Sequence, residues 1–307
     1  MQENHLVSLH NWPADDIQTV LKHAQSLKTH AQEGSLELSL KNKTLALLFE
    51  KASMRTRVSF EVAMIQLGGA SVYLSKSDVN LGKREPVKDG ARVLSRYVNC
   101  IAARVFSHST IEELAEYSDI PVINALSDDT HPCQALADVM TIREEFPDRD
   151  DISLAYVGDA NNVARSLGFA CAKLGINYRI AAPEGYEFDA ESAEAISTLA
   201  TEGESDFEMT NSPEDAVANA DVLYADTWIS MGQEEESAQR LKDFQGYGIN
   251  KDLCNLAAAN HIVLHCLPAY RGNEITDSVI EGPASRVFDQ AENRLHAQRA
   301  LLDLLVN

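Results

Sequence analysis

The chain has 307 residues, of which 45% are hydrophobic and 24% charged, an ordinary globular composition with enough length for two domains of about 150 residues. Its formal net charge of −21 excludes a general basic face for nucleic acid and does not favour anionic membranes. Five cysteines without a CxxC pair argue against a disulfide framework and a Cys-rich zinc site, and the N-terminus lacks signal-peptide features, so we expect a cytoplasmic protein.

The first half of the chain alternates segments typical of helices and strands. An apolar stripe after Pro13 predicts an amphipathic helix over 14–28. A buried strand is predicted over 44–49, and a helix over about 58–67 ends at two glycines. The elements predicted next are a strand over 100–103, a helix near 110–118, a strand over 122–124 and a helix over 134–145.

The second half repeats this alternation after a polar break at 147–151, which is the candidate domain boundary. Strands are predicted over 152–157, 178–181, 222–225 and 262–265, with helices over 163–174 and about 291–305. Strands that alternate with helices of this length favour parallel sheets. The sequence therefore predicts an α/β protein with two domains, each a parallel sheet flanked by helices, over 1–146 and 147–290.

The segment 53–57, Ser-Met-Arg-Thr-Arg, joins the first strand to a helix. Ser53 is placed to cap that helix, and the free backbone N–H groups at a helix N-terminus bind anions. Two arginines and two hydroxyls add donors suited to phosphate. The spacing alone is equally compatible with a capped helix that carries solvated arginines.

A second segment also follows a strand and opens a helix. His131 and Gln134 lie three residues apart at the first turn, so both side chains point toward the same strand end. A neutral His and an amide are donors that polarise a carbonyl oxygen. The alternative is that they only cap the helix, because a lone His-x-x-Gln is a weak motif.

Three other strand ends carry polar residues. Asp226 is suited to binding an ammonium group, although in isolation a polar turn before the acidic stretch 233–236 is the favoured explanation. Cys266 is an activated thiol, a proton acceptor or an inert buried residue. The segment 158–162 follows a strand but lacks the GxGxxG spacing, which argues against a dinucleotide site and hence against a Rossmann dehydrogenase.

Taken together, these segments resemble the carbamoyltransferases nearly from end to end. The phosphate-binding motif Ser-x-Arg-Thr-Arg is present at 53–57, and the carbamoyl-binding motif His-Pro-x-Gln at 131–134. The ornithine branch of the family is marked by Asp-x-x-x-Ser-Met-Gly, present at 226–232, and His-Cys-Leu-Pro, present at 265–268.

The resemblance implies transfer of the carbamoyl group of carbamoyl phosphate to the side-chain amine of L-ornithine, giving citrulline and phosphate without a metal or redox cofactor. It implies catalytic roles for Arg104, His131 and Cys266. The implied carbamoyl-phosphate ligands are Ser53, Met54, Arg55, Thr56, Asn80, Arg104, His131, Gln134, Cys266, Leu267 and Arg294, and the implied ornithine ligands are Asn162, Asp226, Ser230 and Met231. Arg294 would bring the last segment, 291–307, back onto the first domain.

The resemblance also implies a homotrimer, in which a loop carrying Asn80 reaches a neighbouring subunit's site. Many relatives have Gln or His at this position, so the shorter Asn side chain changes the reach of that contact. A carbamoyltransferase for putrescine or an N-acylated ornithine is the enzyme alternative. The alternative of another class is a sensor that binds a phosphorylated metabolite without catalysis.

Overall fold

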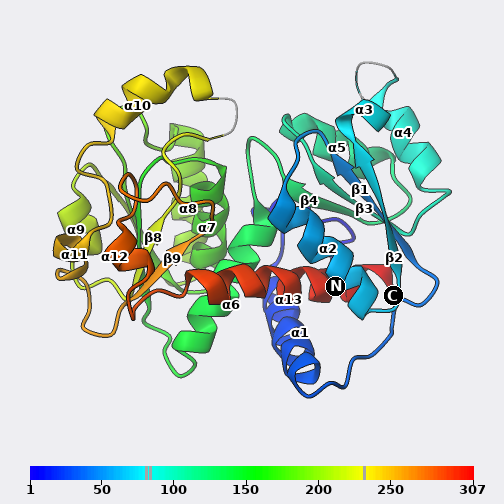
Figure 1. The fold of residues 1–307 in the computed structure, drawn as a ribbon, viewed down its shortest axis with the longest axis horizontal. Coiled ribbons are helices and arrows are strands. Elements are labelled where there is room, and N and C mark those ends of the chain that lie inside the picture. Colours follow the sequence, from blue (N-terminus) through cyan, green and yellow to red (C-terminus); the bar gives the residue numbers. More distant parts are fainter. Residues whose placement is uncertain (80–81, 83–84, 231–232) are drawn as a thin grey trace. The chain divides into compact units, whose positions relative to one another are not determined.

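The computed structural model describes residues 1–79, 82, 85–230 and 233–307. The described chain forms two compact units (Figure 1). Unit 1 comprises Met1–Met140 together with Asn293–Asn307, and unit 2 comprises Thr141–Glu292. No helix within the described ranges is both long and apolar enough to cross a membrane.

Unit 1 is built on a four-stranded parallel sheet with the order β2-β1-β3-β4. Its strands are β1 (Thr44–Phe49), β2 (Ala70–Ser75), β3 (Cys100–Arg104) and β4 (Val122–Leu126). Its helices are α1 (Ala14–Gln32), α2 (Met54–Gln66), α3 (Lys76–Val79), α4 (Val87–Leu94), α5 (His108–Tyr117) and the greater part of α6 (Pro132–Glu145). All residues of β3 are buried, as expected for a parallel strand covered on both faces.

Unit 2 is built on a five-stranded parallel sheet with the order β7-β6-β5-β8-β9. Its strands are β5 (Ser153–Val157), β6 (Asn177–Ala181), β7 (Phe207–Thr210), β8 (Val222–Ala225) and β9 (Ile262–His265). Its helices are α7 (Asn162–Lys173), α8 (Ala190–Glu202), α9 (Pro213–Val217), η1 (Glu234–Glu236), α10 (Ser237–Asp243), α11 (Lys251–Cys254) and α12 (Asp277–Ile280). Strands β8 and β9 are buried along their whole length, although β9 lies at an edge of the sheet.

The last helix, α13 (Val287–Val306), begins in unit 2 and contributes its residues from Asn293 onward to unit 1. There it meets α1, the red and blue helices of Figure 1. Lys28 donates a hydrogen bond to Asn293 at 2.8 Å, and His23 lies 2.7 Å from Asp303. The predicted return of the C-terminal helix to the first domain is therefore confirmed.

The predicted fold class is confirmed: each unit is a parallel sheet flanked by helices. Two helices begin about four residues earlier than predicted, α2 at Met54 and α13 at Val287. The prediction omitted two strands, β2 and β7, and several helices, of which α8 is the longest. Both omitted strands lie at sheet edges and carry exposed residues, so their hydrophobic pattern is weak.

Candidate active site: an arginine cluster and a buried carboxylate

The predicted phosphate loop lies at the carboxyl end of β1 and forms the start of α2. Ser53 is the N-cap of α2, and its Oγ accepts the N–H of Thr56 at 3.4 Å. The Ser53 hydroxyl also donates to Thr56 Oγ1 at 3.1 Å. The first N–H groups of a helix lack acceptors within the helix, so this turn presents donors to an anion. Met54 is 71% exposed, so packing does not require its side chain there.

Arg294 links α13 to two of the predicted ligand segments of unit 1. Its Nη1 donates to Gln134 Oε1 at 2.6 Å, and its Nη2 donates to Thr56 Oγ1 at 3.3 Å. Gln134 in turn donates to Asp138 Oδ1 at 2.7 Å, within a buried environment. Two segments that are far apart in the sequence thus converge on the guanidinium group of a residue that is only 6% exposed.

Arg104 and His131 add charge and polarity to this cluster. Arg104 ends β3 at a register shift between Ala103 and Arg104, an irregularity that re-aims a side chain. Burial, together with the positive charges of Arg294 and Arg55, lowers the pKa of Arg104 to about 10. These mutual repulsions indicate three neighbouring cations, which a bound dianion would relieve.

His131 is 5% exposed at the start of α6. Burial lowers its pKa well below the usual value, and the charges of Arg294 and Arg104 act in the same direction. The imidazole is therefore neutral at pH 7. A neutral imidazole beside arginines can donate a hydrogen bond to a carbonyl oxygen and so polarise the carbonyl group, without adding another positive charge.

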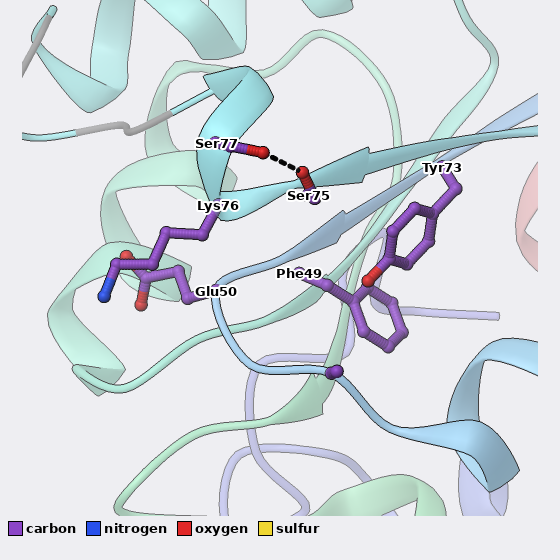
Figure 2. A pocket seen from close by; sticks show the side chains of 7 residues that line it. Phe49, Glu50, Tyr73, Ser75, Lys76 and Ser77 are labelled. Atoms are coloured by element: carbon purple, nitrogen blue, oxygen red, sulfur yellow. Dashed lines mark hydrogen bonds between the residues drawn. The ribbon is translucent and has the colours of Figure 1, made fainter.

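A pocket of about 570 Å³ opens beside the phosphate loop, at the carboxyl ends of β1 and β2 (Figure 2). Its lining residues are Phe49, Glu50, Ala52, Tyr73, Ser75, Lys76 and Ser77. The rings of Phe49 and Tyr73 pack at 5.3 Å between centroids, and the Ser75 and Ser77 hydroxyls are hydrogen-bonded at 2.7 Å. The lining reaches Ala52, one residue before Ser53, so the pocket borders the phosphate loop, but it includes none of the three arginines.

In unit 2, Asp226 forms the centre of a second group of predicted residues. It follows β8, is 6% exposed, and accepts three hydrogen bonds from described residues. The donors are Thr227 N–H at 2.7 Å and Cys266 Sγ at 2.8 Å, both to Oδ1, and Asn161 Nδ2 at 2.8 Å to Oδ2. A carboxylate offers about four acceptor sites, so Asp226 retains capacity for an ammonium donor.

Asn161 was not among the predicted site residues, which included its neighbour Asn162 instead. The Asn161 side chain caps α7 by accepting the N–H groups of Val163 and Ala164, at 2.9 and 3.1 Å. Its amide nitrogen is thereby directed at Asp226. A helix-capping Asn directly after a strand was visible in the sequence, but its partner 65 residues away was not. Asn162 is half-buried in the first position of α7.

Cys266 follows β9 and is half-buried. Its sulfur lies 2.8 Å from a carboxylate oxygen, so the protonated thiol is the favoured form, because a thiolate there would repel Asp226. Asp226, His265 and Cys266 have the residue types and spacing of a metal site. However, Nδ1 of His265 accepts Leu267 N–H at 2.9 Å and Nε2 lies 3.2 Å from Glu274. A metal ion would have to displace one of these bonds.

The segment after Asp226 is held by a buried ion pair. Arg240 Nη1 donates to Asp159 Oδ2 at 2.8 Å and to the carbonyl of Trp228 at 2.9 Å. Burial raises the pKa of Asp159, although Arg240 opposes this shift. Ser230, a predicted ornithine ligand, is half-buried, and its N–H donates to Gln233 Oε1 at 3.0 Å.

The structure thus brings the predicted residues together in two groups, one at the strand ends of each sheet. Leu267 lies beside Cys266 with a positive φ of 58°. Asn80 and Met231 lie outside the described residues.

Comparison with known proteins gives one family over both halves of the chain. The model described as "Aspartate/ornithine carbamoyltransferase, carbamoyl-P binding domain" matches residues 4–144. The model described as "Aspartate/ornithine carbamoyltransferase, Asp/Orn binding domain" matches residues 150–305. These matches together span almost the entire sequence.

Individual relatives agree with the family models. The ornithine carbamoyltransferase of Caldicellulosiruptor saccharolyticus is 49% identical, with 97% of each chain covered. The anabolic ornithine carbamoyltransferase of Pyrococcus furiosus is 49% identical over 98% of this chain and 96% of its own. A solved structure of ornithine carbamoyltransferase from Pyrococcus furiosus superimposes with a TM-score of 0.96, and covers 98% of this chain and 96% of its own.

Proposed function

The chain belongs to the aspartate/ornithine carbamoyltransferase family, and we propose that it transfers the carbamoyl group of carbamoyl phosphate to the side-chain amine of L-ornithine. The products are L-citrulline and phosphate. The assignment of the donor to the domain 1–146 and of ornithine to the domain 147–290 is part of this proposal.

Unit 1 supplies the groups that would bind carbamoyl phosphate. The N-terminal turn of α2, with Ser53 and Thr56, would hold the phosphate through backbone N–H groups and hydroxyls. The charges of Arg55, Arg104 and Arg294 would neutralise it. The neutral His131 and the Gln134 amide would bind the carbamoyl end, which is an uncharged amide.

Unit 2 supplies the groups that would bind and activate ornithine. The side-chain ammonium has a reference pKa of about 10.4, so it must lose its proton before it can attack. The Asp226 carboxylate would hold the amino acid through its cationic α-amino group, with Asn162 and Ser230 beside it. The Cys266 thiol, fixed by Asp226, would border the reacting amine.

The free amine then attacks the carbonyl carbon of the donor and forms a tetrahedral oxyanion. Arg104, His131 and the Thr56 hydroxyl would stabilise this charge as it develops. Collapse of the intermediate breaks the bond from carbon to the phosphate oxygen, and the departing phosphate accepts the surplus proton of the attacking nitrogen. Phosphate is then a good leaving group, because the arginines already neutralise its charge.

The observation that carries the choice of ornithine over an acidic acceptor is the buried carboxylate of Asp226. A buried anion with three ordered donors favours a cationic amino group and would repel an acidic substrate such as aspartate. A colorimetric citrulline assay on purified protein, with ornithine, putrescine, N-acetylornithine and aspartate offered in turn, tests this. Stronger use of putrescine or N-acetylornithine than of ornithine would favour the alternative acceptor, and no carbamoylation at all would favour a sensor.

We also propose a homotrimer in the cytoplasm, with the loop that carries Asn80 reaching a neighbouring site. Analytical ultracentrifugation over a range of concentrations, combined with activity, tests the assembly. A monomer that is fully active in dilute solution would contradict it.

A further inference from the structure

Glu274 is a buried glutamate that lies nine residues after His265, outside every motif that identifies the family in the sequence. Its side chain is 1% exposed, and that of His265 is fully buried. Glu274 Oε1 lies 3.2 Å from His265 Nε2 and also accepts the N–H of Tyr270. Burying a carboxylate costs free energy, so an apolar residue here would make the fold more stable. A buried glutamate at this position therefore suggests a functional role.

The hydrogen bonds around His265 fix which of its nitrogens carries the proton. Leu267 N–H donates to Nδ1 at 2.9 Å, so Nδ1 must be the unprotonated acceptor. The proton therefore resides on Nε2 and is donated to Glu274. The backbone N–H of His265 is held separately by Gln290 Oε1 at 2.8 Å. By accepting a hydrogen bond from Nε2–H, Glu274 thus favours the tautomer whose Nδ1 can accept the hydrogen bond from Leu267 N–H.

This tautomer supports the backbone of the turn that follows β9. Leu267 has a φ of 58°, a left-handed conformation that is unfavourable for a residue with a side chain. Such a conformation persists only where its surroundings impose it. The hydrogen bond from Leu267 to His265 is one such restraint, and the hydrogen bond from Cys266 to Asp226 is another on the adjacent residue.

We propose that Glu274 is a positioning residue for the carbamoyl transfer, acting through the His265 imidazole to hold Cys266 and Leu267 in the geometry that faces the substrates. Glu274 and His265 touch neither substrate in this scheme. The inference rests on the proposed function, because Cys266 and Leu267 are assigned there to the reacting centre.

The test compares Glu274→Ala, Glu274→Gln and a matched control, Asp221→Ala. Asp221 is also a buried carboxylate of unit 2, paired with Arg149 at 2.6 Å, but it precedes β8 and so lies at the opposite end of the strands. Each variant is measured for citrulline formation, thermal unfolding and the state of the His265 ring. The ring is observed by nitrogen-15 NMR on histidine-labelled protein, with His265→Asn identifying its signal.

We expect the wild-type ring to carry its proton on Nε2. We expect Glu274→Ala to lose that tautomer and to lower kcat by about 10- to 100-fold, the range observed when the partner that orients a metal-binding histidine is removed. The Glu274→Gln amide oxygen can accept both bonds, so that variant should retain kcat within about threefold. The Asp221→Ala control should be destabilised to an extent comparable with Glu274→Ala but should keep the wild-type kcat.

Three results would overturn the proposal. The first is a wild-type ring protonated on Nδ1, and the second is a Glu274→Ala protein with kcat within threefold of wild type. The third is an equal loss of kcat in Glu274→Ala and Asp221→Ala, which would show a purely structural role. The NMR result does not require turnover, so it decides the tautomer even if Glu274→Ala fails to fold. A wild-type protein that makes no citrulline but carries the expected tautomer would instead refute the proposed function.

Discussion

Replacing Asp226 by Asn removes one negative charge with almost no change in shape. A hydrogen bond to a charged group contributes about 1.5–3 kcal/mol, and every 1.4 kcal/mol is a factor of ten. The Asp226→Asn variant should therefore raise the KM for ornithine roughly 10- to 100-fold. The KM for carbamoyl phosphate should stay nearly constant, because the arginine cluster lies in the other unit.

The same substitution should also destabilise unit 2, for a reason specific to this geometry. The N–H of Thr227 requires an oxygen at the Oδ1 position, so the new amide nitrogen must face the amide nitrogen of Asn161. Asn161 cannot turn over without losing its cap of α7. Two opposed donors in a buried site cost about 1–3 kcal/mol.

Adding Asn161→Asp to Asp226→Asn should restore most of this stability. An Asp is a good helix cap, and one of its oxygens would accept the hydrogen bond from position 226. Steady-state kinetics and thermal unfolding of the two variants, with Asp221→Asn as the control, measure both effects. An unchanged ornithine KM, or an equal rise for carbamoyl phosphate, would refute the assignment of Asp226. A double variant no more stable than the single one would refute the role of Asn161.

Three further predictions concern the remaining polar groups. Arg104→Ala should lower kcat/KM for carbamoyl phosphate by at least roughly 10²-fold, measured with ornithine saturating; near-normal turnover would contradict its role. The pKa of His131 is lowered in the fold, so below pH about 6.5 the unfolded chain binds a proton that the folded one does not, and stability should fall by up to about 1.4 kcal/mol per pH unit. His131→Gln should reduce this loss when unfolding at pH 7.5 and 5.5 is compared, and equal losses in both proteins would exclude the effect. Arg240→Ala leaves Asp159 buried without its cation and should cost about 3–5 kcal/mol, measured by denaturant unfolding; a change below 1 kcal/mol would show that water replaces the arginine.

The features that were predicted correctly from the sequence are determined by residues that lie close together along the chain. The buried runs of β1, β3, β8 and β9 identify strands, because an apolar segment between polar ones has few other stable arrangements. Ser53 caps α2 as predicted, since a cap needs only its own first turn. Because the sheets are parallel, residues that follow adjacent strands gather at one edge, and this brings Asp226 and Cys266 into contact. In the sequence, only the family motifs joined these two residues.

Only the tertiary structure revealed the edge strand β2 and the hydrogen bonds between residues that are far apart in the sequence. β2 lies at a sheet edge and its residues are exposed or half-buried, so its sequence lacks the apolar run that marks the buried strands. The contact of Arg294 with Gln134 spans 160 residues, and that of Asn161 with Asp226 spans 65. Local propensity therefore determined which segments are helices and strands and which strand ends carry polar groups. The choice of partner for each polar group depended on packing, because a hydrogen bond requires an approach within about 3 Å, which sequence spacing does not define.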